Sequence, residues 1–283
     1  MSQDFEVVKN AVENADKYIT FINALWGVGG FLITKLIWEA VKWSKIRKLK
    51  KVLSVPRRKF SVSNGKFSVF NGKCSISLPY YERNLYGYKV NVVIQQEAIL
   101  QQKIVELLNI IKIQPLPFNN TSTAGYSEIH VGGPIANIRT STYMHNFFPD
   151  LKWNVLPEHR NKYNETDMKK IYEQVIRVNE NKEGFSFGNE DKDFFEYKKD
   201  NKDCAILIKL TPNDLGMNKT VHLLFGGGND GTSQAVNFFA ENHSLLFKKF
   251  KNKHYFIIIP VNKKDKTIDL AQGIKDLTLK AFK

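Results

Sequence analysis

The chain is expected to have an α/β fold, with a Rossmann-like, mostly parallel sheet preceded by a small β/α region and an N-terminal transmembrane helix. Three observations predict this fold: an uncharged apolar stretch near the N-terminus, alternating strand-like and helix-like segments in the second half, and nearly continuous apolar runs in those strands. Apolar strands of this kind are typical of a parallel sheet covered by helices on both faces. With 283 residues, the chain is long enough for one or two domains and an anchor.

The apolar stretch Tyr18–Thr34 has 17 residues and no charge. As a helix it would be roughly 26 Å long, which is close to the hydrocarbon thickness of a bilayer, about 30 Å. Trp38 and Trp43 follow it and suit a membrane interface. The basic residues come after the stretch, whereas a signal peptide has them before it. We therefore predict a membrane helix over residues 18–43, with a helix lying in the membrane surface as the open alternative.

The net charge of +14 is mostly local. Nine basic residues and no acid lie between Lys42 and Lys59, and removing them leaves 33 basic residues against 28 acidic ones. A basic block next to an apolar helix favours anionic lipid as a partner, and nucleic acid is the less favoured alternative. Residues 1–17 carry four acids and two lysines. The positive-inside rule then places the C-terminal part in the cytoplasm, as a single-pass protein of the cell inner membrane.

Cysteine and histidine give no sign of a metal site. The two cysteines, Cys74 and Cys204, are far apart, and the six histidines form no pair with metal-ligand spacing. No disulfide framework, metal or cofactor is therefore predicted, and a reducing compartment fits this composition.

The part between the anchor and the second half is expected to be small. Residues 1–17 form an N-terminal flank and residues 44–58 a basic juxtamembrane segment, ahead of a β-hairpin, helix and linker region at 59–123. Two Asn-Gly pairs, Asn64-Gly65 and Asn71-Gly72, predict a hairpin or meander over Lys59–Leu78. Apolar residues then recur at helical spacing in the second half of Val90–Ile113, namely Leu100, Ile104, Leu107 and Ile111.

A linker is expected at Gln114–Thr123, which is polar and contains two prolines, and the α/β nucleotide-sensing domain should occupy residues 124–283. Helices are predicted in this domain at Glu165–Val178 and Thr232–Phe250. Strands are predicted at Ser127–Gly132, Trp153–Leu156, Asp203–Leu210, Thr220–Phe225 and His254–Val261.

Two glycine-rich turns follow strands of this domain and are the candidate ligand site. Glycine lets a backbone approach a phosphate, and the helix after the turn offers unpaired N–H groups and the positive end of its dipole. Because ligands of open α/β sheets lie beyond the carboxyl ends of the strands, the two turns are expected to form two walls of one site. The candidate ligand-binding residues are Gly132, Gly133, Asn137, Arg139, Gly226, Gly227, Gly228, Asn229, Asp230, Gly231, Thr232 and Ser233.

The motifs GGPIAN (Gly132–Asn137) and GGGNDGT (Gly226–Thr232) resemble those of the Rossmann-like nucleotide-sensing domains called SLOG domains, over about Ser127–Val261. Bacterial antiphage systems of the Thoeris and CBASS types use such domains, or functionally similar ones, joined to membrane or enzymatic effectors. The resemblance implies binding of a nucleotide or nucleotide-derived second messenger at both turns. Related phosphoribohydrolases carry a Glu where this chain has Ala235, which favours sensing over catalysis.

The leading hypothesis is a membrane-anchored effector that senses a nucleotide-derived ligand, forms homo-oligomers and acts on the bilayer, in bacterial antiphage defence. No catalytic residue is assigned. Two alternatives stay open: a membrane-tethered nucleotide or NAD glycohydrolase, in which Asp230 would be required, and a basic nucleic-acid-binding protein that uses Lys42–Lys59.

Overall fold

The computed structural model describes most of the second half of the chain and parts of the first. The described residues are 30–31, 33–53, 62–63, 66–67, 73–78, 81–85, 88–92, 95–111, 113–117, 127–134, 136–157, 175–179, 182–187, 194–196, 202–216, 219–269 and 273–282. They divide into two compact units, Met1–Arg47 and Lys48–Lys283. The predicted N-terminal flank, residues 18–29 and 32 of the predicted membrane helix and residues 54–58 of the basic segment lie outside the described residues.

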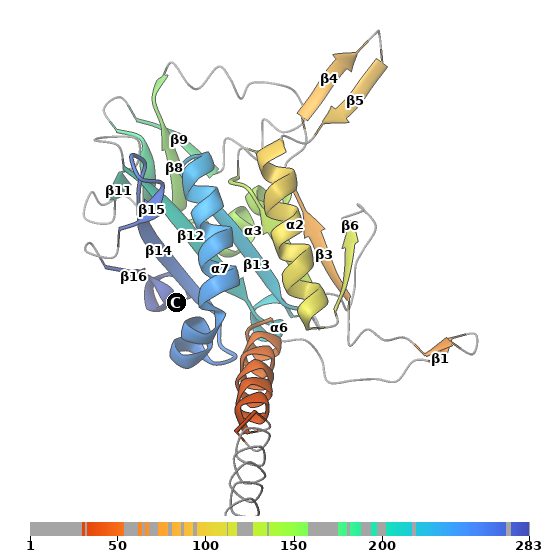
Figure 1. Cartoon of the computed structure of the whole chain (residues 1–283). Helices are drawn as coiled ribbons and strands as arrows, with labels where there is room; N and C mark the ends of the chain where they lie inside the picture. Colours follow the sequence, from red (N-terminus) through yellow and green to blue (C-terminus); the bar gives the residue numbers. More distant parts are fainter. Residues whose placement is uncertain are drawn as a thin grey trace, which may run out of the picture. The chain divides into compact units, whose positions relative to one another are not determined.

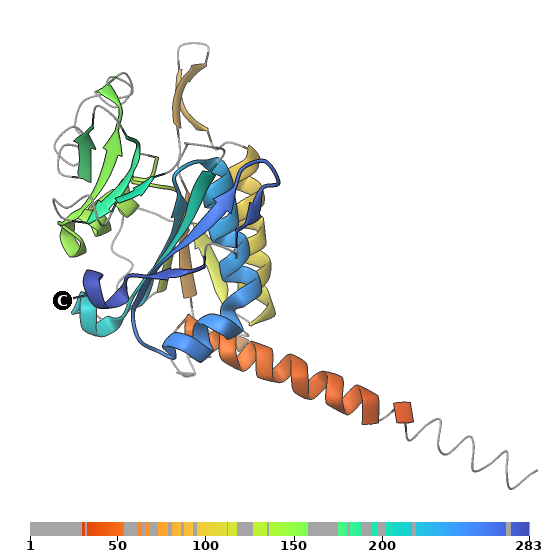
Figure 2. The ribbon, with the colours of Figure 1, turned by 90° about the vertical axis from the view of Figure 1, so that its left-hand side faces the viewer.

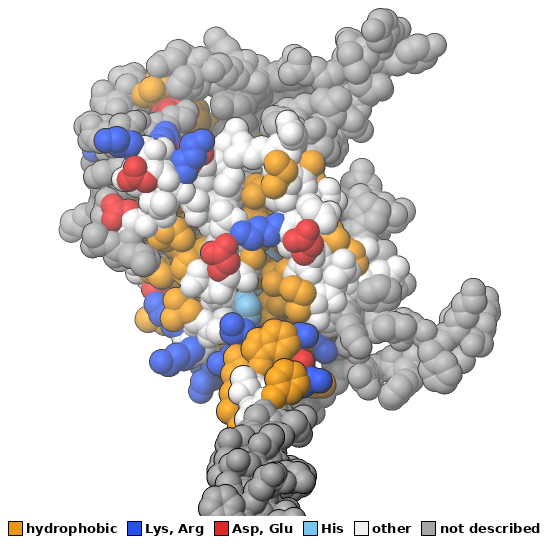
Figure 3. All heavy atoms as spheres, in the orientation of Figure 1, with side chains coloured by type: hydrophobic (Ala, Val, Ile, Leu, Met, Phe, Trp, Pro, Cys, Tyr) orange, Lys and Arg blue, Asp and Glu red, His pale blue; other side chains and the backbone are white. Residues whose placement is uncertain are grey.

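In the first unit the described residues are helical, and the helix continues into the second unit as far as residue 52. Its apolar side chains are exposed, including Trp38 (62 %) and Trp43 (69 %), and they gather on the described part of the helix (Figure 3). Lys35, Glu39 and Lys42 recur at a spacing of four and three, so they share one face of the helix. Among the described residues, no helix has an apolar stretch long enough to cross a bilayer.

The second unit is built on a mixed sheet of eight strands in the described residues, in the order β15-β14-β12-β13-β7-β3-β6, with β16 also paired to β14 (Figure 1). The strands are β3 (Lys73–Ser77), β6 (Gln114–Pro117), β7 (Ser127–Val131), β12 (Lys202–Leu210), β13 (Val221–Gly226), β14 (Tyr255–Asn262), β15 (Thr267–Ile268) and β16 (Lys275–Asp276). Strands β6, β3, β7 and β13 run parallel, while β12 is antiparallel to both β13 and β14.

The antiparallel strand corrects the expectation of a mostly parallel sheet. Only ten residues connect β12 to β13, and they include the short helix α6 (Pro212–Leu215). A parallel crossover needs a dozen or more residues, so this connection returns the chain as an antiparallel neighbour. The α/β class is confirmed, and the sheet contains a run of parallel strands, β13, β7, β3 and β6, which occupies one side of it.

Helices cover the two faces of the sheet unequally. On one face, α2 (Gln95–Ile110) and α7 (Asn229–Phe250) lie side by side (Figures 1 and 2), joined by hydrogen bonds from Lys103 to Asn237 and Glu241. The other face carries α3 (Ile138–Phe147) and a second sheet of order β11-β10-β8-β9 (Figure 2). Its strands are β8 (Leu151–Val155), β9 (Ile176–Val178), β10 (Gly184–Phe187) and β11 (Phe194–Glu196).

The alternation of each strand divides the core between these two faces. Cys204, Ile206, Ile208 and Leu210 of β12 pack with aromatic residues of the second sheet. The intervening residues of β12 face α7, and they include the buried Lys209. The remaining described elements are two hairpins and one helix: β1 (Val62–Ser63) with β2 (Lys66–Phe67), β4 (Tyr81–Leu85) with β5 (Tyr88–Val92), and α8 (Thr278–Ala281).

Several element predictions are confirmed and others are wrong. The predicted strands correspond to β7, β8, β12, β13 and β14, and the predicted helices at Leu100–Ile111 and Thr232–Phe250 to α2 and α7. The linker expected at Gln114–Thr123 begins instead with β6, and Lys73–Ser77 leave the predicted meander to join the main sheet, where both segments pair in parallel. The end of the helix predicted at Glu165–Val178 is strand β9, whereas residues 165–174 lie outside the described residues.

Candidate functional site

The two glycine turns lie side by side at the carboxyl edge of the parallel strands. The N–H of Gly132 donates to the carbonyl of Leu224 on β13 (3.0 Å). A Cβ on Gly133 would lie 3.7 Å from the carbonyl oxygen of Gly226 and only 2.5 Å from the Trp153 ring. Gly132 has φ +99°, a conformation that favours glycine. The parallel pairing of β7 with β13 therefore brings together the two turns, as the sequence predicts.

The first turn is held by Asn137, which is the N-cap of α3. Its Oδ1 accepts the N–H of Arg139 (3.0 Å), and its Nδ2 donates to the carbonyl of Val131 (2.8 Å). Thr140 Oγ1 donates to the carbonyl of Gly132 (2.9 Å). Since Asn137 is buried and its amide is engaged on both sides, its evident role is to fix the start of α3.

The second turn is occupied by a carboxylate of the protein itself. Asp203, at the start of β12, is 3 % exposed and accepts the N–H groups of Cys204 (2.7 Å), Gly228 (3.1 Å) and Gly231 (2.9 Å). Burial raises the pKa of Asp203, while the N–H groups and the charge of Lys263 act in the opposite direction. A helix start is where an anion binds most readily. Two of the N–H groups offered there are thus already paired.

Other candidates in this turn also bond within the protein. Thr232 Oγ1 accepts the N–H of Gly226 (3.1 Å) and donates to the carbonyl of Gly228 (3.0 Å). Gly227 donates to Cys204 (3.2 Å), and Ser233 accepts from Gln96 of α2 (2.8 Å). In the described part of the chain, the backbone N–H groups of Asn229 and Asp230 at the start of α7 therefore remain available to a ligand. Asn229 is exposed and Asp230 is half-buried.

Two lysines add positive charge at this edge, and the sequence analysis did not single them out. Lys263 follows β14 and acts electrostatically on Asp203. Lys266 Nζ lies 3.8 Å from Asp230 Oδ1. The backbone carbonyl of Lys266 accepts a hydrogen bond from the Gln234 side chain of α7. The turn between β14 and β15 thus lies against the start of α7. In sequence, the whole of α7 separates the second glycine turn from the turn between β14 and β15. The pairing of β14 with β12 in the sheet brings these two turns together.

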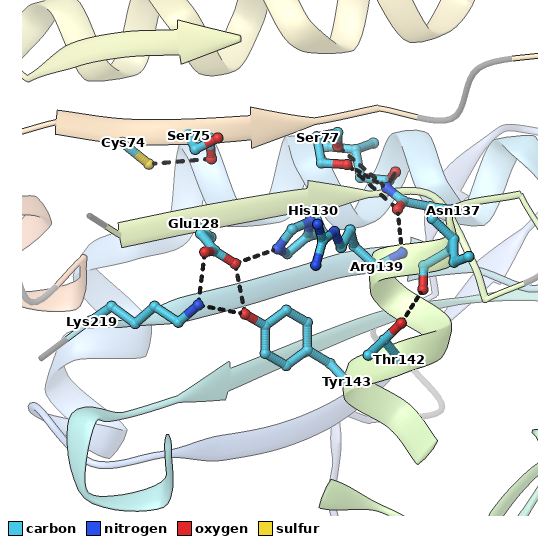
Figure 4. Close-up of polar contacts among 12 residues, drawn as sticks. Cys74, Ser75, Ser77, Glu128, His130, Asn137, Arg139, Thr142, Tyr143 and Lys219 are labelled. Atoms are coloured by element: carbon cyan, nitrogen blue, oxygen red, sulfur yellow. Dashed lines mark hydrogen bonds and ion pairs between the residues drawn. The ribbon is translucent and has the colours of Figure 1, made fainter. Parts of the chain in front are cut away.

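Arg139 was expected to contact ligand phosphate, but its charge acts on a buried polar cluster behind the first turn. Burial lowers the pKa of His130 and raises the pKa of Tyr143, and the nearby charge of Arg139 acts on both groups. Figure 4 shows the Arg139 side chain beside His130. The cluster centres on Glu128, whose carboxylate accepts from His130 Nε2 (3.0 Å), the Tyr143 hydroxyl (2.7 Å) and Lys219 Nζ (2.8 Å).

The Glu128 cluster is electrostatically balanced. Burial opposes ionisation of Glu128, but hydrogen bonds from His130 and Lys219 outweigh it and hold its pKa well below the usual range. Burial lowers the pKa of His130, so this ring is neutral at pH 7. A fully paired acid of this kind stabilises a fold and is a poor proton acceptor.

The described residues contain no group of three or more His, Cys, Asp or Glu side chains that could hold a metal ion. Cys74 and Cys204 are buried free thiols, and burial raises the pKa of each. Compared with known proteins, the chain matches no family model, no curated protein and no solved structure.

Proposed function

We propose that this protein is a membrane-associated sensor that binds a nucleotide or nucleotide-derived second messenger at the carboxyl edge of β7 and β13, without consuming it. The observation that carries the proposal is the adjacency of the two glycine turns, joined from Gly132 to Leu224. This edge is where open α/β sheets bind their ligands. A role in bacterial antiphage defence follows only from the resemblance of the two motifs to SLOG domains.

The ligand's anionic groups would bind above the start of α7. The N–H groups of Asn229 and Asp230, the helix dipole and the two lysines Lys263 and Lys266 supply the attraction. The buried Asp203 lies beneath and repels a phosphate that approaches too deeply. The site is therefore suited to an anion at the rim of the turn, with the sugar or base extending along the edge.

The N-terminal helix supports the membrane part of the proposal. Seven large apolar residues on it are at least half exposed: Phe31, Ile33, Leu36, Ile37, Trp38, Val41 and Trp43. Such a surface needs a partner, and the basic residues that follow favour anionic lipid. In this proposal the C-terminal unit faces the cytoplasm, and ligand binding drives homo-oligomerisation that clusters the helices in the bilayer.

Thermal unfolding of the full chain in detergent tests the ligand site. We would add nucleotides, cyclic oligonucleotides and ADP-ribose derivatives one at a time, and compare wild type with the double variant Lys263→Gln/Lys266→Gln. The matched control is Lys248→Gln/Lys253→Gln, which removes two exposed lysines elsewhere in the same unit. A ligand that binds only the native state raises Tm by several degrees at saturation.

The proposal predicts a Tm rise for one ligand class in wild type and in the control, and its loss in the Lys263/Lys266 variant. Analysis of the same samples for products should show no turnover, and sedimentation should show larger assemblies with ligand. Consumption of the nucleotide would support the glycohydrolase alternative. A Tm rise that survives in the Lys263/Lys266 variant would place the site elsewhere, and the absence of any rise would refute the nucleotide proposal.

A further inference from the structure

A second cluster of buried polar side chains lies at the opposite edge of the main sheet. Lys209 of β12 pairs in register with His222 of β13 on one side and with Tyr255 of β14 on the other. These residues lie near the end of β12 and near the starts of β13 and β14. All three are at most 1 % exposed. They therefore form one row across three strands, at the amino edge of the parallel strands and away from the glycine turns.

The rings of His222 and Tyr255 converge within the row, and the charge of Lys209 acts on His222. The strands carrying His222 and Tyr255 flank β12, so their backbones are about 10 Å apart, yet the two ring centroids lie only 6.4 Å apart. Both rings thus lean toward the strand of Lys209. Helix α7 covers them, since Phe239 contacts the His222 ring (5.1 Å) and Phe250 contacts the Tyr255 ring (5.0 Å).

The polar atoms of this row have no hydrogen-bond partner among the described residues. In the described part of the chain, Lys209 Nζ, both ring nitrogens of His222 and the Tyr255 hydroxyl make no hydrogen bond. The same holds for Oγ1 of Thr220, which lies two residues before His222 and hence on the same face of an extended chain. Buried polar groups are almost always hydrogen-bonded, so several such atoms in one place indicate a missing partner.

The chemistry of the row selects an anion. Lys209 offers three donors, and the hydroxyls of Tyr255 and Thr220 and one N–H of His222 add to them. Asp214 is the acid that acts electrostatically on Lys209. However, its oxygens already accept from Thr211 (2.7 Å) and His254 (2.8 Å). The cluster therefore has an excess of donors and of positive charge.

We propose that Lys209, His222, Tyr255 and Thr220 form an internal binding site for a compact monovalent anion, such as a halide or formate. The anion accepts hydrogen bonds from the ammonium and hydroxyl groups and balances the buried charge. Asn242 interrupts the helical geometry of α7 between Phe239 and Phe250 (φ −108°, ψ 19°). Opening of α7 at this kink admits the ion.

The test follows thermal unfolding of the full chain at constant ionic strength while sodium gluconate is replaced by bromide, chloride or formate. Gluconate is too bulky for the site and serves as the reference. We expect a saturable rise in Tm of about 5 °C at an anion concentration of ~100 Kd. Lys209→Met should abolish the rise. Lys253→Met, at an exposed position, should keep it.

Tyr255→Phe removes one oxygen and should weaken the apparent affinity about fivefold, the worth of one hydrogen bond. If Lys209→Met fails to fold, Tyr255→Phe alone tests whether the anion binds in this row. Bromide-soaked crystals should show an anomalous peak within hydrogen-bond distance of Lys209. Three outcomes would each overturn the proposal: an equal Tm rise in wild type and Lys209→Met, no rise with any of the anions, or no bromide peak. The row would then hold water alone. The site is independent of the glycine turns, so these outcomes do not bear on the nucleotide proposal.

Discussion

Gly231 shows at the residue scale why a glycine in the second turn is needed without reference to any ligand. A Cβ at this position would lie 2.2 Å from the carbonyl oxygen of Cys204 and 2.7 Å from Asp203 Oδ1. Both atoms belong to the start of β12, which is fixed in the middle of the sheet. The close approach of α7 to β12 therefore requires glycine here.

We expect Gly231→Ala to lower the free energy of unfolding by about 3 kcal/mol or more, because backbone and carboxylate must both shift. Gly216→Ala is the control, since Gly216 has φ +63° but open space around it. It should cost about 1 kcal/mol for the strained φ alone. Urea unfolding of both variants measures the difference. Equal losses would mean that the contact with β12 is not the reason for glycine at position 231.

His222 makes the stability of the protein sensitive to acid. Burial, helped by the charge of Lys209, holds its pKa well below the ordinary value of 6.5. In the unfolded chain the ring takes up a proton below about pH 6.5, whereas the folded protein excludes that proton. Its contribution to stability is thus present above this pH and is lost as the pH falls.

Between pH 6.5 and 5.5 this single group should lower the free energy of unfolding by up to about 1.4 kcal/mol. His222→Gln removes the titration, so the variant should show a shallower fall over the same interval. Urea unfolding at pH 7.5, 6.5 and 5.5 measures both slopes. The same slope in wild type and variant would contradict burial of a neutral His222.

At the scale of elements, Asp203 ties the start of α7 to strand β12. Its carboxylate accepts three backbone N–H groups, from Cys204, Gly228 and Gly231. Asp203 lies on β12, whereas α7 directly follows β13. Asp203 therefore caps the start of α7 from a distant part of the chain, which the local sequence of the helix does not predict. The helix that carries half of the candidate site is thereby fixed against the sheet.

Asp203→Ala should destabilise the protein by about 2–3 kcal/mol, since it leaves buried N–H groups without an acceptor. Asp203→Asn, which keeps one acceptor oxygen, should cost less. Asp265→Ala, at an exposed position of the next turn, is the control and should stay within about 0.5 kcal/mol of wild type. Thermal and urea unfolding give the comparison. A larger loss for Asn than for Ala would rule out the capping role.

The Glu128 cluster joins three elements on the other face of the sheet. Glu128 and His130 lie on β7, Tyr143 lies on α3, and Lys219 precedes β13. The network fixes α3 against the sheet and thereby positions the first glycine turn (Figure 4).

Glu128→Gln should cost about 3 kcal/mol, because it leaves the half-buried Lys219 without its counter-charge. Tyr143→Phe removes two hydrogen bonds, one donated to Glu128 and one accepted from Lys219, and should cost about 1–2 kcal/mol. In a double-mutant cycle between the two positions, we expect a coupling energy of at least about 0.5 kcal/mol. Strictly additive losses in urea unfolding would show that the two side chains act independently.

At the scale of the whole molecule, the exposed apolar helix and the basic residues after it predict association with anionic membranes. Full-length protein should sediment with vesicles containing phosphatidylserine more strongly than with neutral vesicles, and added salt should weaken the binding. Trp38→Glu/Trp43→Glu should reduce partitioning about tenfold or more. Leu279→Glu, at a position that is 91 % exposed in the other unit, is the control. Unchanged sedimentation of the tryptophan variant would refute a membrane role for this segment.

Much of the chain from α2 onward could be predicted from its sequence. Strands β7, β12, β13 and β14 and helices α2 and α7 follow from local periodicity, and the two glycine turns were found because each follows an apolar strand. Strand β6 was missed because two prolines in Gln114–Pro117 are typical of a linker. Among the described strands, β6 lies at the edge of the sheet and pairs only with β3, on one side. Proline, which has no backbone N–H to donate, is tolerated in such an edge strand.

The sequence by itself determined the α/β class, the central strands and the glycine turns, because the alternation of apolar residues and the freedom of glycine are local properties. Only the tertiary structure decided that Asp203 occupies the start of α7, that Lys263 and Lys266 belong to the candidate site, and that Lys209, His222 and Tyr255 form one buried row. The physical reason is strand pairing: it joins residues far apart in the chain, and its register is set by packing between segments, which no local pattern encodes.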